Sequence, residues 1–335
     1  MFDYLVFIGR FQPFHLGHQA VIAEALRQSR DVIVLIGSAG VPRSTRNAFD
    51  FAERAHMIKS GFAPQDAPRI HCVALHDRLY NDTRWVQQVQ QAVASVVNMP
   101  QAKIGLIGHN KDQSSYYLAL FPHWKSVSVA NYHGISATPI RDSYLLGAMP
   151  RPELVPATTM QFLQDFQQTP MYVELQKEAE FVDAYKKQWE QSPYPPTFVT
   201  VDAVVVQSGH VLLVERQAMP GQGLWALPGG FINQKETLLD ACVRELREET
   251  RLKVPDPVLR GSMRAQRTFD DPYRSARGRT ITQAFYFELR NDPSGLPKVK
   301  GGDDAKRAFW VPLAELSEQQ LFEDHYAIIG EMAGL

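Results

Sequence analysis

The chain has little of what marks secreted, membrane or nucleic-acid-binding proteins. It has two cysteines, Cys72 and Cys242, which we expect in core elements of different halves. This excludes a disulfide framework and indicates a reducing compartment, the cytoplasm. The formal net charge is -1, so charge gives no reason to expect a nucleic acid or a membrane surface as partner. No apolar run approaches the roughly 18 residues of a membrane span. The short apolar stretch near the start contains Asp3 and lacks the basic leader of a signal peptide.

What is present is the composition of a globular protein with enough residues, 335, for about two domains. The first half alternates apolar strand patterns with helical patterns. We expect strands at 4–9, 31–37, 69–75, 103–108 and 125–130, and helices at 15–29, 51–61, 83–98, 114–121 and 139–146. Asp50 and Glu53 read as a capping pair for the second helix. The alternation predicts an α/β domain whose parallel sheet has helices on both faces.

The character of the sequence changes in the second half. A helical pattern over 158–190 is followed by a stiff, proline-rich segment that breaks helices. Beyond it we expect strands at 197–207, 210–215, 281–289 and 308–311, and a strong helix at 236–250. We therefore predict a first domain over 1–190, a linker over 191–197 and an α+β domain over 198–335.

The most informative segment is GRFQPFHLGH, residues 9–18, between the first strand and the first helix. His15 and His18 stand three residues apart at the helix start. There they would share one face with unpaired backbone N–H groups and the positive end of the helix dipole. Such a surface binds polyanions, and Gly17 would let a ligand approach closely. A lone histidine would more often be a solvated cap, but the pair favours an anion site.

Basic and polar residues follow other strands of the first half. Candidates for phosphate contacts are Arg46, Lys111, Ser136, Thr138 and Arg141. Thr138 is expected as an N-cap and Pro139 as the first helical residue, so this helix start could hold a phosphate. Taken singly, each basic residue could be part of a surface salt bridge. Because ligands bind beyond the carboxyl ends of parallel strands, we expect these residues to converge on one rim.

Together with TRN at 45–47, KDQSSYYL at 111–118 and ISATPIR at 135–141, these motifs resemble the nucleotidyltransferase superfamily with the His-x-Gly-His signature. They are most similar to archaeal-type nicotinamide mononucleotide (NMN) adenylyltransferases, over roughly residues 1–150. The resemblance implies a Rossmann-like domain that joins ATP to NMN and releases pyrophosphate, with Mg²⁺ on the triphosphate. It implies catalytic roles for His15, His18 and Arg141.

The same resemblance implies further binding residues. Those for ATP or phosphate are Gly9, Phe11, His15, His18, Arg46, Lys111, Ser136, Thr138 and Arg141. Asn81 and Trp85 match a segment that recognises the nicotinamide end. A planar cationic ring favours an aromatic face, although Trp85 could instead be helix core.

A second motif lies in the second half, where Glu245, Glu248 and Glu249 occupy positions i, i+3 and i+4 of a predicted helix. Their carboxylates would share one face and repel one another, which a divalent cation would relieve. Oxygen ligands indicate Mg²⁺, or Mn²⁺, rather than zinc. Such an ion can activate water and neutralise a pyrophosphate. Glu236 and Arg244 are expected to form a structural ion pair. The alternative is an exposed acidic helix face.

With LPGG at 227–230 ahead of it, this pattern resembles the Nudix box, and the resemblance covers about 198–335. It implies a Nudix fold with Glu245, Glu248 and Glu249 as catalytic metal ligands. The sequence departs from the box at Arg251, where a glycine normally ends the helix in a left-handed turn. Arginine there would cost about 1 kcal/mol or more unless the helix ends differently. We expect altered stability or loop shape rather than lost metal binding, and reduced activity stays open.

LWALPGGF at 224–231 and RGRTIT at 277–282 resemble ADP-ribose-type Nudix enzymes, in which Arg277 and Arg279 could contact a diphosphate or be ordinary strand-edge charges. The whole chain thus resembles bifunctional NMN adenylyltransferase/Nudix hydrolases. That implies NAD synthesis from NMN and ATP, and cleavage of ADP-ribose to AMP and ribose 5-phosphate. Two alternatives stay open: a transferase for nicotinate mononucleotide or another nucleotide, and a Nudix half that senses ADP-ribose without hydrolysis. No basic recognition helix follows Leu316, which argues against DNA binding. The sequence leaves a homo-oligomer open.

Overall fold

A computed structural model describes residues 1–108, 120–130 and 132–335. The chain divides into two compact units, Met1–Ala179 and Glu180–Leu335, and we describe each by itself. The division falls inside helix α6 (Pro170–Lys187), upstream of the proline-rich segment at 191–197. Among the described residues, no helix is long and apolar enough to cross a membrane.

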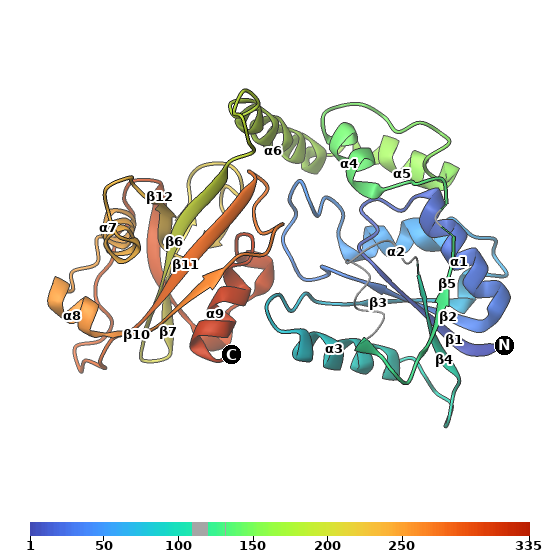
Figure 1. The fold of residues 1–335 in the computed structure, drawn as a ribbon, viewed down its shortest axis with the longest axis horizontal. Helices are drawn as coiled ribbons and strands as arrows, with labels where there is room; N and C mark the ends of the chain where they lie inside the picture. The colour runs from blue at the N-terminus through green and yellow to red at the C-terminus, as the bar shows by residue number, and fades with distance from the viewer. Residues whose placement is uncertain (109–119, 131) are drawn as a thin grey trace. The chain divides into compact units, whose positions relative to one another are not determined.

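The first unit contains the five-stranded parallel sheet that the alternating pattern predicts (Figure 1). Its strands are β1 (Phe2–Gly9), β2 (Ser29–Ile36), β3 (Ile70–Ala74), β4 (Ile104–Gly108) and β5 (Lys125–Ser128). Their order is β3-β2-β1-β4-β5. The connections run in opposite directions on the two sides of β1, and ligands bind at the carboxyl end of such a switch point. The segment after β1 therefore lies where a site is expected.

Helices cover both faces of this sheet because successive residues of a strand point to opposite sides. Leu5 and Phe7 of β1 belong to the core that includes residues of α1 (Leu16–Gln28), α2 (Phe51–Ser60), α5 (Ala157–Phe166) and α6. Tyr4 and Val6 belong to the other core, beneath α3 (Asp82–Ala94). The continuous apolar run of β1 therefore predicts that helices cover both faces of the sheet.

Local capping confirms one prediction and corrects another. Asp50 and Glu53 cap α2 reciprocally, as predicted. The helix α4 (Ala137–Leu145) has Ser136 as its N-cap. Thr138 is therefore not the N-cap, and Pro139 lies inside the first turn rather than at its first position.

Other expected helices in this half differ in extent. The pattern over 158–190 forms two helices, α5 and α6, which are separated by residues 167–169. The helix expected over 114–121 lies for the most part outside the described residues.

The second unit is built on a mixed seven-stranded sheet, the α+β arrangement that was predicted (Figure 1). The main order is β10 (Met263–Phe269), β11 (Arg279–Glu288), β6 (Thr197–Gln207), β7 (His210–Arg216) and β12 (Ala305–Pro312). The short strands β8 (Trp225–Ala226) and β9 (Gly229–Phe231) pair with β7 and β6. Strands β6 and β11 are parallel, and the other pairs are antiparallel.

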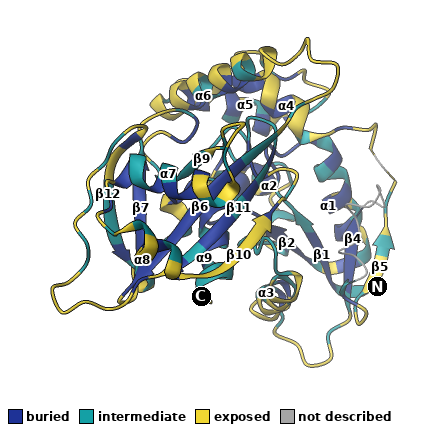
Figure 2. Cartoon of the chain, turned by 60° about the vertical axis from the view of Figure 1, so that its left-hand side comes forward, coloured by how far each residue is buried: buried dark blue, intermediate teal, exposed yellow. Residues whose placement is uncertain are grey.

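Helix α7 (Leu238–Thr250) packs on one core of this unit with Val201, Ala203 and Val205 of β6. The intervening Asp202 points away from that core, toward α9 (His325–Ala333). Strands β6 and β7 are buried, whereas the edge strand β10 is exposed along most of its length (Figure 2). Our sequence reasoning missed β10, α8 (Asp256–Gly261) and α9. The polar sequence of β10 and the nearly uniform apolarity of α9 hide the periodicity of each.

Candidate functional site

In the first unit, the two predicted histidines form the start of α1 together. His15 is the N-cap, and its Nδ1 accepts a hydrogen bond from the backbone N–H of His18 at 3.3 Å. The backbone N–H of His15 donates in return to Nδ1 of His18 at 3.4 Å. The rings stack with centroids 3.6 Å apart. Because both Nδ1 atoms accept, each neutral ring carries its proton on Nε2, the atom that can donate to an anion.

The backbone at this helix start offers less than expected. The N–H of Leu16 donates to the carbonyl of Leu154 at 3.0 Å, and that of His18 is used by His15. The expectation of unpaired N–H groups is therefore wrong for these two. Gly17 also has a structural reason, since a Cβ there would lie 3.0 Å from Cε1 of His15. The imidazoles are what this helix start presents to a ligand.

Arginines from three segments influence one another at this end of the sheet. Burial, together with the charges of Arg46 and Arg141, lowers the pKa of Arg10 to about 10. Arg141 is 5% exposed, and burial lowers its pKa as well. Nη1 of Arg10 and Nε of Arg141 are buried with no hydrogen-bond partner in the described part of the chain. Crowded cations with unused donors favour an anion as ligand.

Sequence reasoning identified Arg46 and Arg141 but missed Arg10, although Arg10 belongs to the ten-residue motif. It also missed Arg54, which is 1% exposed. Arg54 donates to the backbone carbonyls of Arg10 at 2.8 Å and Gly37 at 2.6 Å. It therefore fixes the loops that follow β1 and β2. The sequence could have indicated this role only if the burial of Arg54 within α2 had been foreseen.

Phe11 and Gly9 have a packing role in this structure, and their predicted contact with ATP stays a prediction. The Phe11 ring is 1% exposed and packs against Phe7 and, with centroids 4.7 Å apart, His18. A Cβ on Gly9 would lie 2.9 Å from Cζ of Phe11. The structure thus places the Phe11 ring in the core behind His18, and Gly9 leaves room for it.

The residues predicted for the nicotinamide end have local roles of their own. Asn81 is the N-cap of α3 and accepts a hydrogen bond from the N–H of Arg84 at 3.1 Å. Trp85 is half-buried against the α3 core, with its ring 6.0 Å from that of Phe121. These contacts agree with the alternative of Trp85 as helix core, and the binding role stays a prediction. Lys111 lies outside the described residues.

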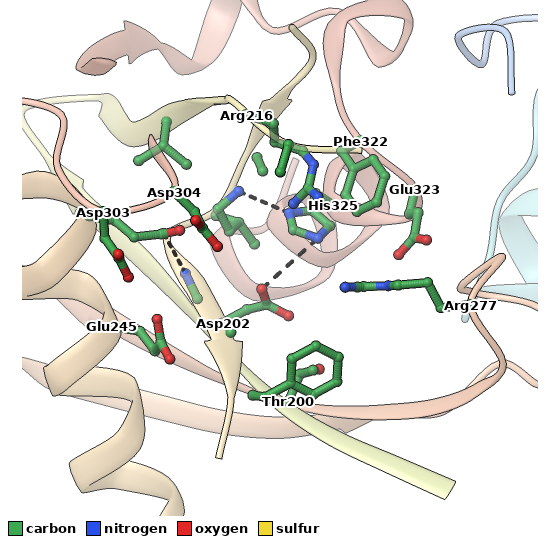
Figure 3. A pocket seen from close by; sticks show the side chains of 18 of the residues that line it. Thr200, Asp202, Arg216, Glu245, Arg277, Asp303, Asp304, Phe322, Glu323 and His325 are labelled. Carbon is green, nitrogen blue, oxygen red and sulfur yellow. Dashed lines mark hydrogen bonds and ion pairs between the residues drawn. The ribbon is translucent and has the colours of Figure 1, made fainter. Parts of the chain in front are cut away.

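The second unit contains a pocket of about 240 Å³ beside α7 (Figure 3). Its charged lining residues are Asp202, Glu245, Glu249, Asp303, Asp304, Glu323, Arg216, Arg274 and Arg277. Glu245, Asp303 and Asp304 lie at one end, and Glu323 and Arg277 lie at the other (Figure 3). A pocket with an acidic end and arginines beyond it suits an anion that is bound through a metal ion.

Glu249 lies in this pocket where its charged form is disfavoured. Its side chain is buried, and Oε2 accepts a hydrogen bond from the N–H of Gly229 at 3.0 Å. Burial, together with the charges of Glu245 and Asp202, raises the pKa of Glu249 to about 8. Burial raises the pKa of Glu245 too. A hard divalent cation between these oxygens would relieve both effects, so the donor set fits such an ion.

Glu248 does not join them. Its side chain is 46% exposed and pairs with Arg244 at 2.9 Å. Arg244 also pairs with Glu245 and, as predicted, with Glu236, each at 2.7 Å. Nη1 of Arg244 thus bonds both Glu245 and Glu248, of which only Glu245 lines the pocket, and the role of Glu248 as a metal ligand stays a prediction. Within the described ranges, no three His, Cys, Asp or Glu side chains already form a metal cluster.

Arg251 adopts the left-handed conformation that glycine would take, with φ 52° and ψ 27°. Its N–H donates to the carbonyl of Arg247 at 3.0 Å, so α7 ends in the usual way with an unusual residue. The expected strain is thus present. Gly302 makes room for the arginine, since a Cβ there would lie 2.7 Å from Nε of Arg251.

Arg277 and Arg279 have different environments. Arg277 lines the pocket, and its Nε is buried with no hydrogen-bond partner among the described residues. Arg279 donates to the carbonyl of Asp270 and does not line the pocket. Arg277 fits the predicted diphosphate contact, and Arg279 fits the alternative of a strand-edge charge.

Comparisons with known proteins agree with this division. The model of the NUDIX domain matches residues 196–331, and the Cytidylyltransferase-like model matches residues 6–143. The nicotinamide/nicotinic acid mononucleotide adenylyltransferase of Acinetobacter baylyi is 47% identical over 177 residues, which cover 52% of this chain and 93% of that protein. The ADP-ribose pyrophosphatase of Methanocaldococcus jannaschii is 35% identical over 131 residues, covering 39% of this chain and 70% of that protein.

A solved structure matches both units at once. It is a bifunctional NMN adenylyltransferase/ADP ribose pyrophosphatase from Francisella tularensis, complexed with AMP and a manganese ion. It is 36% identical with a TM-score of 0.92, covering 100% of this chain and 99% of that one. The chain belongs to this bifunctional family. The stacked histidines and the neighbouring arginines lie in the nucleotidyltransferase unit of this chain. The pocket beside α7 lies in its Nudix unit. Nudix hydrolases need a divalent metal.

Proposed function

We propose that this chain is a bifunctional enzyme of NAD metabolism. The nucleotidyltransferase unit transfers AMP from ATP to NMN and releases pyrophosphate. The Nudix unit hydrolyses ADP-ribose to AMP and ribose 5-phosphate. The observation that carries this proposal is the presence of two built anion sites in a chain that matches a bifunctional enzyme over its whole length.

In the first site, the chemistry requires positioning and charge rather than a general base, because the attacking phosphate of NMN is already ionised. Arg10, Arg46 and Arg141 neutralise the triphosphate. The Nε2–H groups of His15 and His18 donate to oxygens on which charge develops. We assign further phosphate contacts to Ser136 and Thr138 and, beyond the described residues, to Lys111.

Further assignments in the first site follow from the family resemblance. We assign the nicotinamide end to Asn81 and Trp85. Mg²⁺, when bound, would be held mainly by phosphate and water oxygens and would supply positive charge to the triphosphate.

In the second site, Glu245 and Glu249 are the residues that would hold the divalent ion, and Glu248 could reach it only by leaving Arg244. The ion supplies Lewis acidity and an activated water. Arg216 and Arg277 bind the diphosphate. Arg216 is held for this by its hydrogen bond to the carbonyl of Pro220 at 3.0 Å and by the Phe322 ring, 4.0 Å away. We propose Mg²⁺ as the physiological ion, with Mn²⁺ as the alternative.

One alternative has a specific observation in its favour. The strained Arg251 at the end of α7 keeps open a Nudix unit that binds ADP-ribose without cleaving it. Nicotinate mononucleotide is the alternative acceptor in the first site. The cytoplasmic location stays a prediction, and a homo-oligomer stays open.

The first test is chromatography of products after incubation with ADP-ribose and Mg²⁺ or Mn²⁺. AMP that appears with the wild type and is absent with Glu249→Gln supports the hydrolase. Binding without AMP makes the unit a sensor. For the first site, NMN and nicotinate mononucleotide compete for ATP in one reaction, and the dinucleotide formed faster identifies the acceptor.

A further inference from the structure

The end of the Nudix pocket beside Arg277 contains a segment that the proposed mechanism leaves unused. This segment is the three consecutive residues Glu323, Asp324 and His325, which lead into α9. Glu323 and His325 line the pocket, on the side away from Glu245 (Figure 3). This segment carried no motif, and its position beside the site is decided by the fold.

Asp324 and His325 hold this segment in one geometry. Asp324 accepts two hydrogen bonds from Arg274, at 2.9 and 2.8 Å, in an ion pair whose side chains are 1% and 3% exposed. Nδ1 of His325 accepts a hydrogen bond from the N–H of Leu227 at 2.9 Å. Charge-assisted, fully buried bonds of this kind define a single backbone conformation.

The bonds of Asp324 and His325 fix the backbone beside Glu323, which lines the pocket. Its φ is 46°, a left-handed conformation that is unfavourable for a residue with a side chain. Oε1 accepts a hydrogen bond from the N–H of Ala276 at 3.3 Å, and the side chain also bonds Ser275. Burial raises the pKa of Glu323, whereas the nearby cations Arg277 and Arg274 favour its charged form. A carboxylate can accept about four hydrogen bonds. Glu323 therefore keeps capacity for donors that enter the pocket.

The charge of Glu323 limits what can bind beside it. The proposed diphosphate contacts run from the metal ligands through Arg216 to Arg277, which lies beside Glu323. The next group of the substrate then meets a carboxylate held in place by buried partners. A phosphate oxygen there would be repelled by Glu323, whereas a hydroxyl group would donate to it. A vicinal diol offers two such donors.

We propose that Glu323 binds the vicinal hydroxyls of a ribose of ADP-ribose and so determines specificity for that sugar. This inference rests on the proposed substrate of the Nudix unit. ADP-ribose has one ribose on each side of the diphosphate, and both carry the same chemistry. The experiment must therefore distinguish them.

The test is equilibrium titration of the full chain in Mg²⁺ with the α,β-methylene analogues of ADP-ribose, ADP and 2′,3′-dideoxy-ADP, in which the bridging carbon prevents cleavage of the diphosphate. We expect Glu323→Gln to weaken ADP-ribose binding about 10-fold or more, as for the loss of a charged hydrogen bond. Unchanged ADP binding would identify the ribose beyond the diphosphate. An equal loss for ADP, with none for the dideoxy ligand, would identify the adenosine ribose.

Two further variants separate recognition from folding. Glu323→Gly removes the carboxylate but suits the left-handed backbone, so it should lose the same affinity without loss of stability. Glu331 lies in α9, which follows Glu323, and pairs with Arg267 outside the pocket lining, so Glu331→Gln should bind within twofold of wild type. Wild-type affinity of Glu323→Gln for ADP-ribose would overturn the inference. So would an equal loss for all three ligands. A wild type that binds ADP-ribose but makes no AMP would overturn only the proposed hydrolysis.

Discussion

The two sites of this chain manage phosphate with opposite charges. The nucleotidyltransferase site gathers Arg10, Arg46 and Arg141, whose mutual repulsion and burial lower the pKa of Arg10 to about 10. The Nudix site gathers carboxylates, and burial raises the pKa of Glu249 to about 8. In both sites, like charges are held together in a place where water is scarce. The first repulsion is relieved by the triphosphate itself, and the second needs a metal ion before it can accept a diphosphate.

Each site also has one arginine that supports the others. Arg54 is buried and donates to backbone carbonyls, so it shapes the loops of the first site. Arg244 is part-exposed and pairs with Glu236, Glu245 and Glu248, so it neutralises glutamates directly beside the second pocket. The comparison teaches that the same side chain can organise a cationic site through the backbone and an anionic site through direct neutralisation.

The sharpest way to separate the two sites is His18→Ala. It removes the Nε2 donor and the reciprocal cap of α1, so NAD formation should fall at least about 100-fold. AMP production from ADP-ribose should be unchanged. Both products are measured on one preparation by chromatography. His56→Ala, at an exposed position of α2, is the matched control. NAD formation at near the full rate in His18→Ala would remove this residue from the site.

Glu249→Gln is the reciprocal change. It should lower ADP-ribose hydrolysis about 100-fold or more, because a buried ligand for the ion is lost, while NAD formation continues. Glu248→Gln is the control that the structure provides, since this exposed partner of Arg244 should cost less than about 10-fold. Equal losses in the two variants would return Glu248 to the metal site and contradict its observed place.

The opposite charges also predict a pH dependence confined to the Nudix unit. The folded-state pKa of Glu249, about 8, lies above its ordinary value of 4.5. Its protonated form therefore contributes stability at low pH, and this contribution is lost as the pH rises through about 8. In EDTA, the melting temperature of the Nudix unit should fall between pH 6 and 9, and less so in Glu249→Gln. Added Mg²⁺ should raise it more at pH 8 than at pH 6. An identical pH profile for both proteins would contradict this.

The smallest effect is expected from Arg251→Gly. It relieves a left-handed backbone, which should stabilise the Nudix unit by about 1 kcal/mol or less after the loss of the arginine contact at Gly302. Denaturant unfolding measures the change, and hydrolysis should stay within twofold. A large gain in hydrolysis would instead show that Arg251 restrains the site.

The nucleotidyltransferase half could be predicted in more detail than the Nudix half. Its parallel strands are continuous apolar runs, such as β1, and its site residues follow those strands directly. The second half contains β10 and α9, whose patterns do not have a clear period, and its pocket draws residues from seven separate segments. Arg10 and Glu323 were missed for one reason: no spacing in the sequence shows which charge will be buried beside another.

The sequence by itself determined the two units, the parallel nature of the first sheet, the histidine pair and the glutamates of α7. These are local properties, since apolar periodicity and helix geometry act over a few residues. Only the tertiary structure decided which members of each set face a ligand. It stacked His15 on His18, turned Glu248 toward Arg244, and brought Glu323 from the far end of the chain to the pocket. The physical reason is that burial and charge are set by neighbours distant in sequence, and those neighbours assemble only when the chain folds.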